Sequence, residues 1–252
     1  MPGSSQHMGD SMAIDNDDRI TANSVLRRLP PSVFERLKIH ITPIELIPRQ
    51  VLYRADVPLT DVYFITRGLV SQVMTMADGR TVEATAIGPE GIVGALAAFA
   101  INRPMFDTIV QLSGTADRIP YSVFREEAEN DAETMDRLRR YIYFTLRRIV
   151  QMSACNSLHS VEQRCCRWLL IAHDSAGGDG FTVTQQVLSS LLGVQRVGVT
   201  IAAGALQRVG LIRYSRGHLS VTDRAGLEAK ACECYAAIRT LYDEVLGDMA
   251  VA

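Results

Sequence analysis

The sequence contains no uninterrupted apolar run of the roughly 18 residues that a membrane-spanning helix requires, and its start lacks the apolar core of a secretory signal. Cysteine is scarce, because the chain has five, all beyond residue 154, and an odd number does not suit a disulfide framework. We therefore expect a cytoplasmic protein with no membrane partner. Residues 1–20 are polar and small, and we expect them to be a disordered or tag-derived tail.

Acidic residues are absent from Phe181 to Thr222, although the whole chain carries 28 of them and a formal net charge of −2. The cationic and titratable residues of this segment are Arg196, Arg208, Arg213, Arg216 and His218. A locally basic segment on a slightly acidic protein is typical of a discrete DNA-binding module. No Ser/His/Asp arrangement, metal triad or phosphate-binding loop accompanies it, so we expect no enzymatic activity.

The predicted secondary structure changes twice along the chain, from helices to strands and back to helices. Residues 21–40 have the spacing of two short helices, and residues 43–120 consist of short β-branched segments broken by Gly, Pro and Asp. Asp78-Gly79 stands between two alternating runs, which is a strong signal of a β-hairpin. Several short strands at this spacing predict an antiparallel sandwich or barrel, and a helical period follows from about residue 121.

The longest helical run extends from about residue 132 to residue 157. Its apolar residues recur at steps of three and four and draw one stripe along a helix. The residues predicted to form a dimer contact along this stripe are Leu138, Ile142, Leu146, Ile149 and Met152. We expect this long helix to pair with a second copy, although such a stripe could also pack on its own domain.

The acid-free segment has the pattern of two short helices joined by a tight turn. Thr184 can cap the first helix, and Gly193 can take the left-handed conformation that the turn needs. Gln195 opens the second helix, and residues 211–221 then predict a hairpin that would form a wing. A helix pair with a Gly-containing turn is the arrangement that reads DNA in many regulators.

Side chains near the start of the second helix can read bases, because Gln pairs with adenine and Arg with guanine in the major groove. The start of the first helix can hold phosphate with its free amide groups. The residues expected to contact DNA are Thr184, Gln185, Gln195, Arg196, Thr200, Arg213, Arg216 and His218.

Three segments, "VYFITRGLV", "GPEGIVGALAAF" and "TQQVLSSLLGVQRVGVTIAAGALQRVGLI", together resemble the Crp–Fnr superfamily of transcription regulators. The resemblance implies an α+β fold with an N-terminal antiparallel, jelly-roll-like β-roll and flanking helices over residues 21–130. A long dimerisation helix over 131–158 and a winged helix-turn-helix with a C-terminal helix over 159–252 would follow. It also implies a homodimer on a palindromic double-stranded operator, with RNA polymerase as a partner of an activator, and Arg196 as a base reader.

The effector site departs from this resemblance. Members that bind cyclic nucleotides carry Gly-Glu and, further on, Arg followed by Ser or Thr. Here Gly94 precedes Ala95, the second region reads "PMFD", and Arg103 lies out of register. A buried phosphate without a cation keeps its desolvation cost, so we expect no useful cAMP affinity and no cofactor. The candidate pocket residues are Gly91, Gly94, Ala95, Leu96, Met105 and Phe106.

Three alternatives stay open. An apolar pocket suits a small hydrophobic or uncharged effector of unknown identity, whereas a filled pocket would leave a vestigial sensor and an effector-independent regulator. A third alternative is a regulator that responds to thiol chemistry or metal through Cys155, Cys165, Cys166, Cys232 and Cys234. Because adjacent and one-apart cysteines on a helix point in different directions, we expect ordinary thiols and no metal. Cys155 and His159, four residues apart, could share a helical face.

Overall fold

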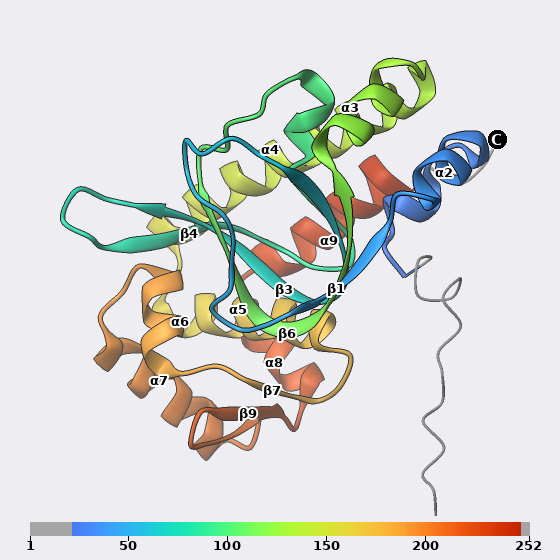
Figure 1. The fold of residues 1–252 in the computed structure, drawn as a ribbon. Coiled ribbons are helices and arrows are strands. Elements are labelled where there is room, and N and C mark those ends of the chain that lie inside the picture. The colour runs from blue at the N-terminus through green and yellow to red at the C-terminus, as the bar shows by residue number, and fades with distance from the viewer. Residues whose placement is uncertain (1–21, 248–252) are drawn as a thin grey trace, which may run out of the picture.

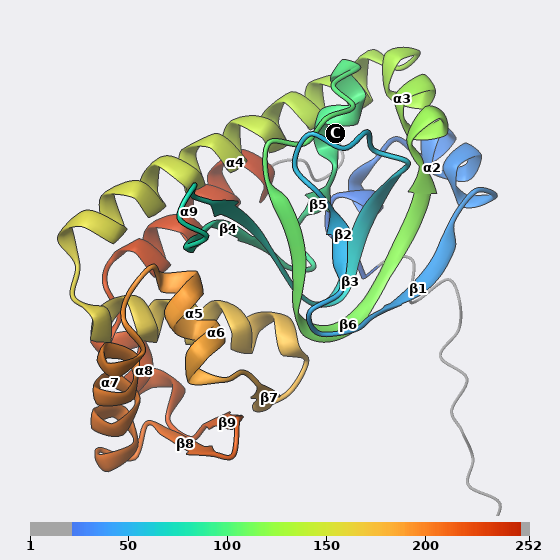
Figure 2. The same cartoon turned by 60° about the vertical axis from the view of Figure 1, so that its left-hand side comes forward.

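The computed structural model describes residues 22–247, so the predicted tail of residues 1–20 lies outside the described residues. Its N-terminal half is a curled antiparallel sheet flanked by short helices (Figures 1 and 2). The strands join in the order β1-β6-β3-β4, with β2 on β6 and β5 on β3. The N-terminal elements are η1 (Leu26–Arg28), α2 (Pro31–Lys38), β1 (Thr42–Leu46), β2 (Val51–Tyr53), β3 (Asp61–Thr75), β4 (Thr81–Ile87), β5 (Ile92–Val93), η2 (Ala95–Phe99), β6 (Asp107–Pro120) and α3 (Tyr121–Glu129).

Two long strands, β3 and β6, form the centre of the sheet and pair along most of their length. Buried and solvent-facing residues alternate along β6, as expected for a strand with one face on the core. The predicted hairpin at Asp78-Gly79 is confirmed between β3 and β4, where Gly79 adopts a φ of 83°. The strands β3 and β6 approach each other closely at Gly114. Position 114 therefore requires glycine, since any side chain there would collide with the backbone of Arg67.

The long helix α4 (Ala132–Leu158) begins where the Asp131 carboxylate accepts a hydrogen bond of 2.7 Å from the Thr134 amide. Its 27 residues span about 40 Å and run along the edge of the sheet towards the C-terminal half (Figure 2). The predicted bounds of this helix agree with the structure to within a few residues at each end.

The apolar stripe predicted along α4 does not face one way. Leu138 is 0% exposed and Met152 is 6% exposed, so both side chains lie in the chain's own core and are not available to a second copy. Ile142 and Ile149 are half-buried, and Leu146 is exposed. The apolar residues that α4 presents to solvent are Tyr143, Leu146, Val150 and Leu158, hereafter the exposed stripe.

The C-terminal half is a winged helix-turn-helix that packs on the sheet. Its single tryptophan, Trp168, is fully buried in a cluster that includes Leu69 and Leu112 of the sheet. Its elements are α5 (Val161–Ala176), β7 (Gly180–Thr182), α6 (Gln185–Leu192), α7 (Arg196–Arg208), β8 (Ile212–Ser215), β9 (His218–Val221) and α8 (Arg224–Lys230), with strand order β7-β9-β8. The predicted α+β architecture is confirmed.

The last helix, α9 (Cys234–Leu246), leaves the DNA-binding half and runs back along α4 (Figures 1 and 2). Leu241 and Leu246 join the N-terminal core, and Arg28 donates a hydrogen bond of 2.8 Å to the Tyr242 hydroxyl. α9 therefore packs along the central and C-terminal turns of α4, from Phe144, whose ring meets Tyr242, to Gln151, which bonds Cys234.

Within residues 22–247, no single helix has both the length and the apolar composition of a membrane span. The bent pair of α6 and α7 reaches those limits by length and composition alone.

Candidate functional site

The helix-turn-helix is defined by local hydrogen bonds. The Thr184 hydroxyl accepts a bond of 3.2 Å from the Val187 amide and caps α6. α6 ends at Gly193 in the left-handed conformation, with φ of 62°, and the Val194 amide donates to the Ser189 carbonyl at 3.0 Å. The chain is bent by 112° between α6 and α7, within the range of DNA-reading helix pairs.

The start of α7 presents a polar face to solvent. Gln195, Arg196 and Thr200 are exposed, and the Thr200 hydroxyl donates a hydrogen bond of 2.7 Å to the Gln185 side chain. The opposite face of α7 is buried in the core of the domain through Val199, Ala202, Ala203 and Leu206. Val197 and Ile201, 60% and 66% exposed, lie beside the polar side chains, so the reading face is partly apolar.

The predicted wing is the hairpin of β8 and β9. Arg216 and Gly217 both have positive φ, at 51° and 83°, as a tight two-residue turn requires. Arg213, Arg216 and His218 are exposed. Tyr214 fixes the wing to the helix pair, because its hydroxyl donates to the Val183 carbonyl at 2.8 Å. The structure therefore places all eight predicted DNA contacts on two adjoining elements, α6–α7 and the wing.

A cavity of about 210 Å³ lies between the sheet, η2 and α4. Five of the six predicted pocket residues line it, namely Gly94, Ala95, Leu96, Met105 and Phe106. Gly91 is not on its wall, because it lies beneath Tyr141, with which a side chain at this position would collide. The Tyr141 hydroxyl accepts a hydrogen bond from the Ile92 amide at 2.8 Å and is held there.

Arg103, which lies out of register in the sequence motif, is also on the cavity wall. Its guanidinium donates to the Asp56 carbonyl at the exposed rim, so it does not point into the apolar interior. A side chain larger than glycine at position 94 would collide with Tyr53, whose hydroxyl donates to the Asp61 carbonyl at 2.5 Å. The interior of the cavity is thus apolar, with one cation at its mouth among the described lining residues.

The two halves of the chain each match a known domain family. The cyclic nucleotide-binding domain matches residues 43–131, and the Crp-like helix-turn-helix domain matches residues 163–230. The chain belongs to the Crp–Fnr superfamily of transcription regulators. The family consists of DNA-binding regulators rather than enzymes. No curated protein matches the chain in sequence.

Solved structures of other Crp–Fnr regulators share the fold at low sequence identity. FixK2 from Bradyrhizobium japonicum is 16% identical with a TM-score of 0.65, and the match covers 76% of this chain and 98% of FixK2. A CRP-family regulator from Thermus thermophilus is 20% identical with a TM-score of 0.62, covering 75% and 96%. CLP from Xanthomonas campestris, described as responsive to c-di-GMP, is 18% identical with a TM-score of 0.58, covering 76% and 99%.

Sequence reasoning missed the contribution of α4 to the regulator's cavity. Tyr141, Ile142, Thr145, Leu146 and Ile149 all line it. The apolar spacing of α4 predicts a dimer contact alone for three of these, Ile142, Leu146 and Ile149. The width of the apolar stripe could have indicated this, because a broad apolar face of a helix can line a cavity and also contact a second chain.

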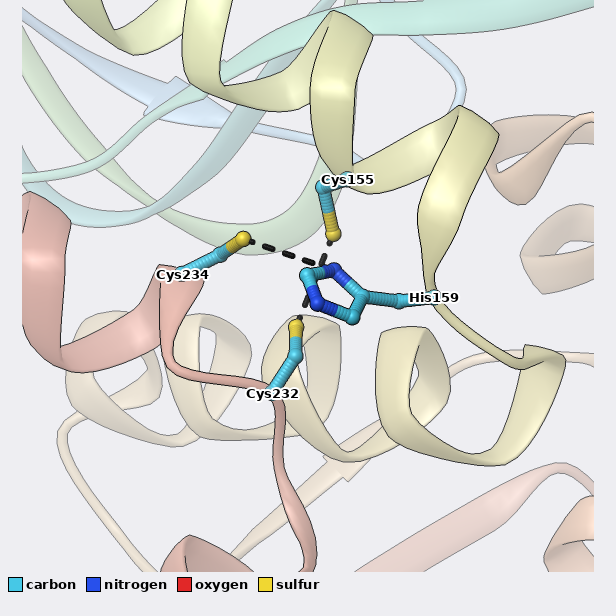
Figure 3. A group of neighbouring side chains, drawn as sticks. All are labelled: Cys155, His159, Cys232 and Cys234. Carbon is cyan, nitrogen blue, oxygen red and sulfur yellow. Dashed lines mark hydrogen bonds between the residues drawn. The ribbon is translucent and has the colours of Figure 1, made fainter.

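The expectation that Cys232 and Cys234 lie on one helix and point in different directions is wrong. Cys232 lies in the connection before α9 and Cys234 in the first turn of α9, so the two thiols do not diverge as they would inside one helix. Both approach Cys155 and His159 at the end of α4 (Figure 3). Cys165 and Cys166 are buried in the core of the DNA-binding half, apart from this group.

Proposed function

We propose that this regulator is a homodimer that binds a palindromic operator and responds to a small, largely apolar effector other than cAMP. The observation that carries the proposal is the exposed face at the start of α7, where Gln195, Arg196 and Thr200 stand on a helix held by the turn at Gly193. Such a face can enter the major groove, and a two-fold dimer places two copies about one helical turn apart, ~34 Å.

The exposed stripe supports pairing through α4. Leu146 and Val150 are 57% and 58% exposed on the rigid helix that connects the two halves of the chain. Isolated exposed apolar residues need no explanation, but a row at helical spacing is the seam of a coiled-coil contact. A second copy of α4 is the occupant that would bury this row and bring two reading helices together. If the regulator is an activator, RNA polymerase is a further partner.

The cavity supports the choice of effector. The described lining residues offer no cation to a phosphate buried in its interior, since Arg103 is bonded to a carbonyl at the rim. The doubly charged ligand named for the Xanthomonas relative would need at least two such partners. Because Leu146 both lines the cavity and lies on the exposed stripe, an occupant would act on the dimer contact directly.

The test is selection of bound duplexes from a random pool, followed by fluorescence anisotropy on the selected sequence at several salt concentrations. We expect a palindromic site bound by two chains, with affinity that falls as salt rises. We expect cAMP to change neither this affinity nor the melting temperature. A monomer that ignores every duplex at low ionic strength would overturn the proposal, and a micromolar response to cAMP would overturn the choice of effector.

A further inference from the structure

Four side chains that commonly ligate metals meet where α4 ends (Figure 3). They are Cys155, His159, Cys232 and Cys234, hereafter the hinge cluster, and their ligand atoms all lie within 4.8 Å of one another. The Cys155 and Cys232 sulfurs are 3.5 Å apart, and the Cys234 sulfur is 3.6 Å from His159 Nδ1. The three cysteines are buried, and only His159 is partly exposed.

These separations fit a single tetrahedral ion. Bonds of about 2.3 Å from zinc to sulfur place two tetrahedral ligands about 3.8 Å apart. A disulfide would need the sulfurs at about 2.05 Å, and an iron–sulfur cluster would hold them apart by its own width. Three thiolates and one imidazole are among the established donor sets of closed structural zinc sites.

The neighbours of the cluster orient its ligands in the manner of a metal site. Glu233 Oε1 lies 3.2 Å from His159 Nε2, which leaves Nδ1 free to ligate on the side of Cys234. A carboxylate on the distal ring nitrogen is the usual partner of a zinc-bound histidine. The Gln151 amide nitrogen donates to the Cys234 sulfur at 3.1 Å.

Two buried arginines interact electrostatically with Cys155 of the hinge cluster. Arg164 and Arg167 are 7% and 3% exposed, and no carboxylate of the described residues lies within ion-pair distance of Arg167. Among the described residues, Arg167 Nε has no hydrogen-bond partner, and Nη1 donates to the Met152 sulfur at 2.6 Å. Three thiolates, a neutral imidazole and a divalent ion carry a net charge of −1, which these cations offset.

We propose that the hinge cluster binds one zinc ion per chain in a closed tetrahedral site. A surface hollow of about 370 Å³ beside Cys232 and Glu233 gives the ion a route from solvent. The ion would connect the end of α4 to the start of α9. Its ligand His159 caps the end of α4 and directly precedes Ser160, which caps the start of α5. The ion thereby fixes the joint between the long helix and the DNA-binding half.

The test uses the full chain, stripped of metal by a chelator under reducing, oxygen-free conditions. Co²⁺ should give the intense visible bands of a tetrahedral thiolate site, and one equivalent of Zn²⁺ should remove them. Cys232→Ser should abolish the bands, and Glu233→Gln should weaken zinc binding about 10–100-fold. Cys166→Ala, which removes a buried thiol outside the cluster, should change neither.

Absence of the tetrahedral bands in wild-type protein that keeps its helical circular dichroism overturns the proposal without reliance on any variant. Equal zinc affinity of wild type and Cys232→Ser also overturns it. A Cys155–Cys232 disulfide in protein isolated without reductant, with no metal uptake after reduction, replaces it by a redox pair. All these measurements are made without DNA, so they stand or fall separately from the proposed function.

Discussion

Replacing Arg196 by alanine removes an exposed guanidinium from the first turn of α7, and among the described residues this guanidinium makes no side-chain hydrogen bond or ion pair that the change would break. The hydroxyl of Thr200 keeps its bond to Gln185, and the buried face of α7 is untouched. We therefore expect the variant to fold normally and to lose affinity only where Arg196 contacts DNA.

The magnitude depends on the kind of contact. A bidentate arginine–guanine pair contributes about 1–3 kcal/mol of discrimination, so a dimer with two Arg196 side chains would lose about 2–6 kcal/mol on a symmetric operator. At about 1.4 kcal/mol per factor of ten, the affinity falls by about 30-fold to about 20,000-fold. A duplex that carries only one half-site should show about half of this free-energy change.

The assay compares wild type and Arg196→Ala on the selected operator and on duplexes with each base pair substituted symmetrically. Wild type should lose affinity when the contacted base pair is changed, whereas the variant should be indifferent to that change. Arg208→Ala, exposed at the far end of α7, is the matched control and should leave base preference unchanged. The base-reading role is refuted if Arg196→Ala weakens every duplex equally and lowers the salt slope by about 2, which is the signature of phosphate contacts.

Three further predictions concern the rest of the fold. Val150→Glu should raise the dimer dissociation constant more than about a hundredfold in sedimentation experiments, since an unpaired buried charge costs about 3–5 kcal/mol; an unchanged dimer would remove α4 from the contact. Trp168→Ala should lower the free energy of unfolding by about 3–5 kcal/mol in chemical denaturation, and a loss under about 1 kcal/mol would contradict its place in the shared core. Burial raises the pKa of Glu83, so its contribution to stability is full below about pH 4.3 and is lost as pH rises through the folded-state pKa. The difference in unfolding free energy between wild type and Glu83→Gln should fall over that rise, and a flat difference would refute the assignment.

Features set by chemistry within a few residues were predictable from the sequence. The cap at Thr184, the left-handed turn at Gly193 and the hairpin at Asp78-Gly79 all appear where the residue types place them. Each depends on one side-chain hydrogen bond or on the conformational freedom of glycine, and neither needs a distant partner. The order of the β-roll, the long helix and the helix-turn-helix was therefore predictable from the sequence.

The orientation of α4 could not be predicted in this way. Periodicity identifies an apolar face but does not say whether the core or a second chain covers it. Leu138 and Met152 meet the chain's own core, and Arg148 is 5% exposed, with a hydrogen bond of 3.1 Å to Glu90. The return of α9 along α4 decides which face stays open, and residues nearly a hundred positions away carry that information.

The hinge cluster depends on the same return. Cys155 and Cys232 are 77 positions apart, and they meet only because α9 starts beside the end of α4. α4 then carries the cavity wall at Leu146, the exposed stripe at Val150 and two ligands of the cluster within its last turns and cap. Because a hydrogen-bonded helix turns as one body, a rotation that reshapes the cavity wall also moves the stripe and the joint to α5. An occupant of the cavity and an ion at the cluster would therefore act on one shared element rather than through separate routes.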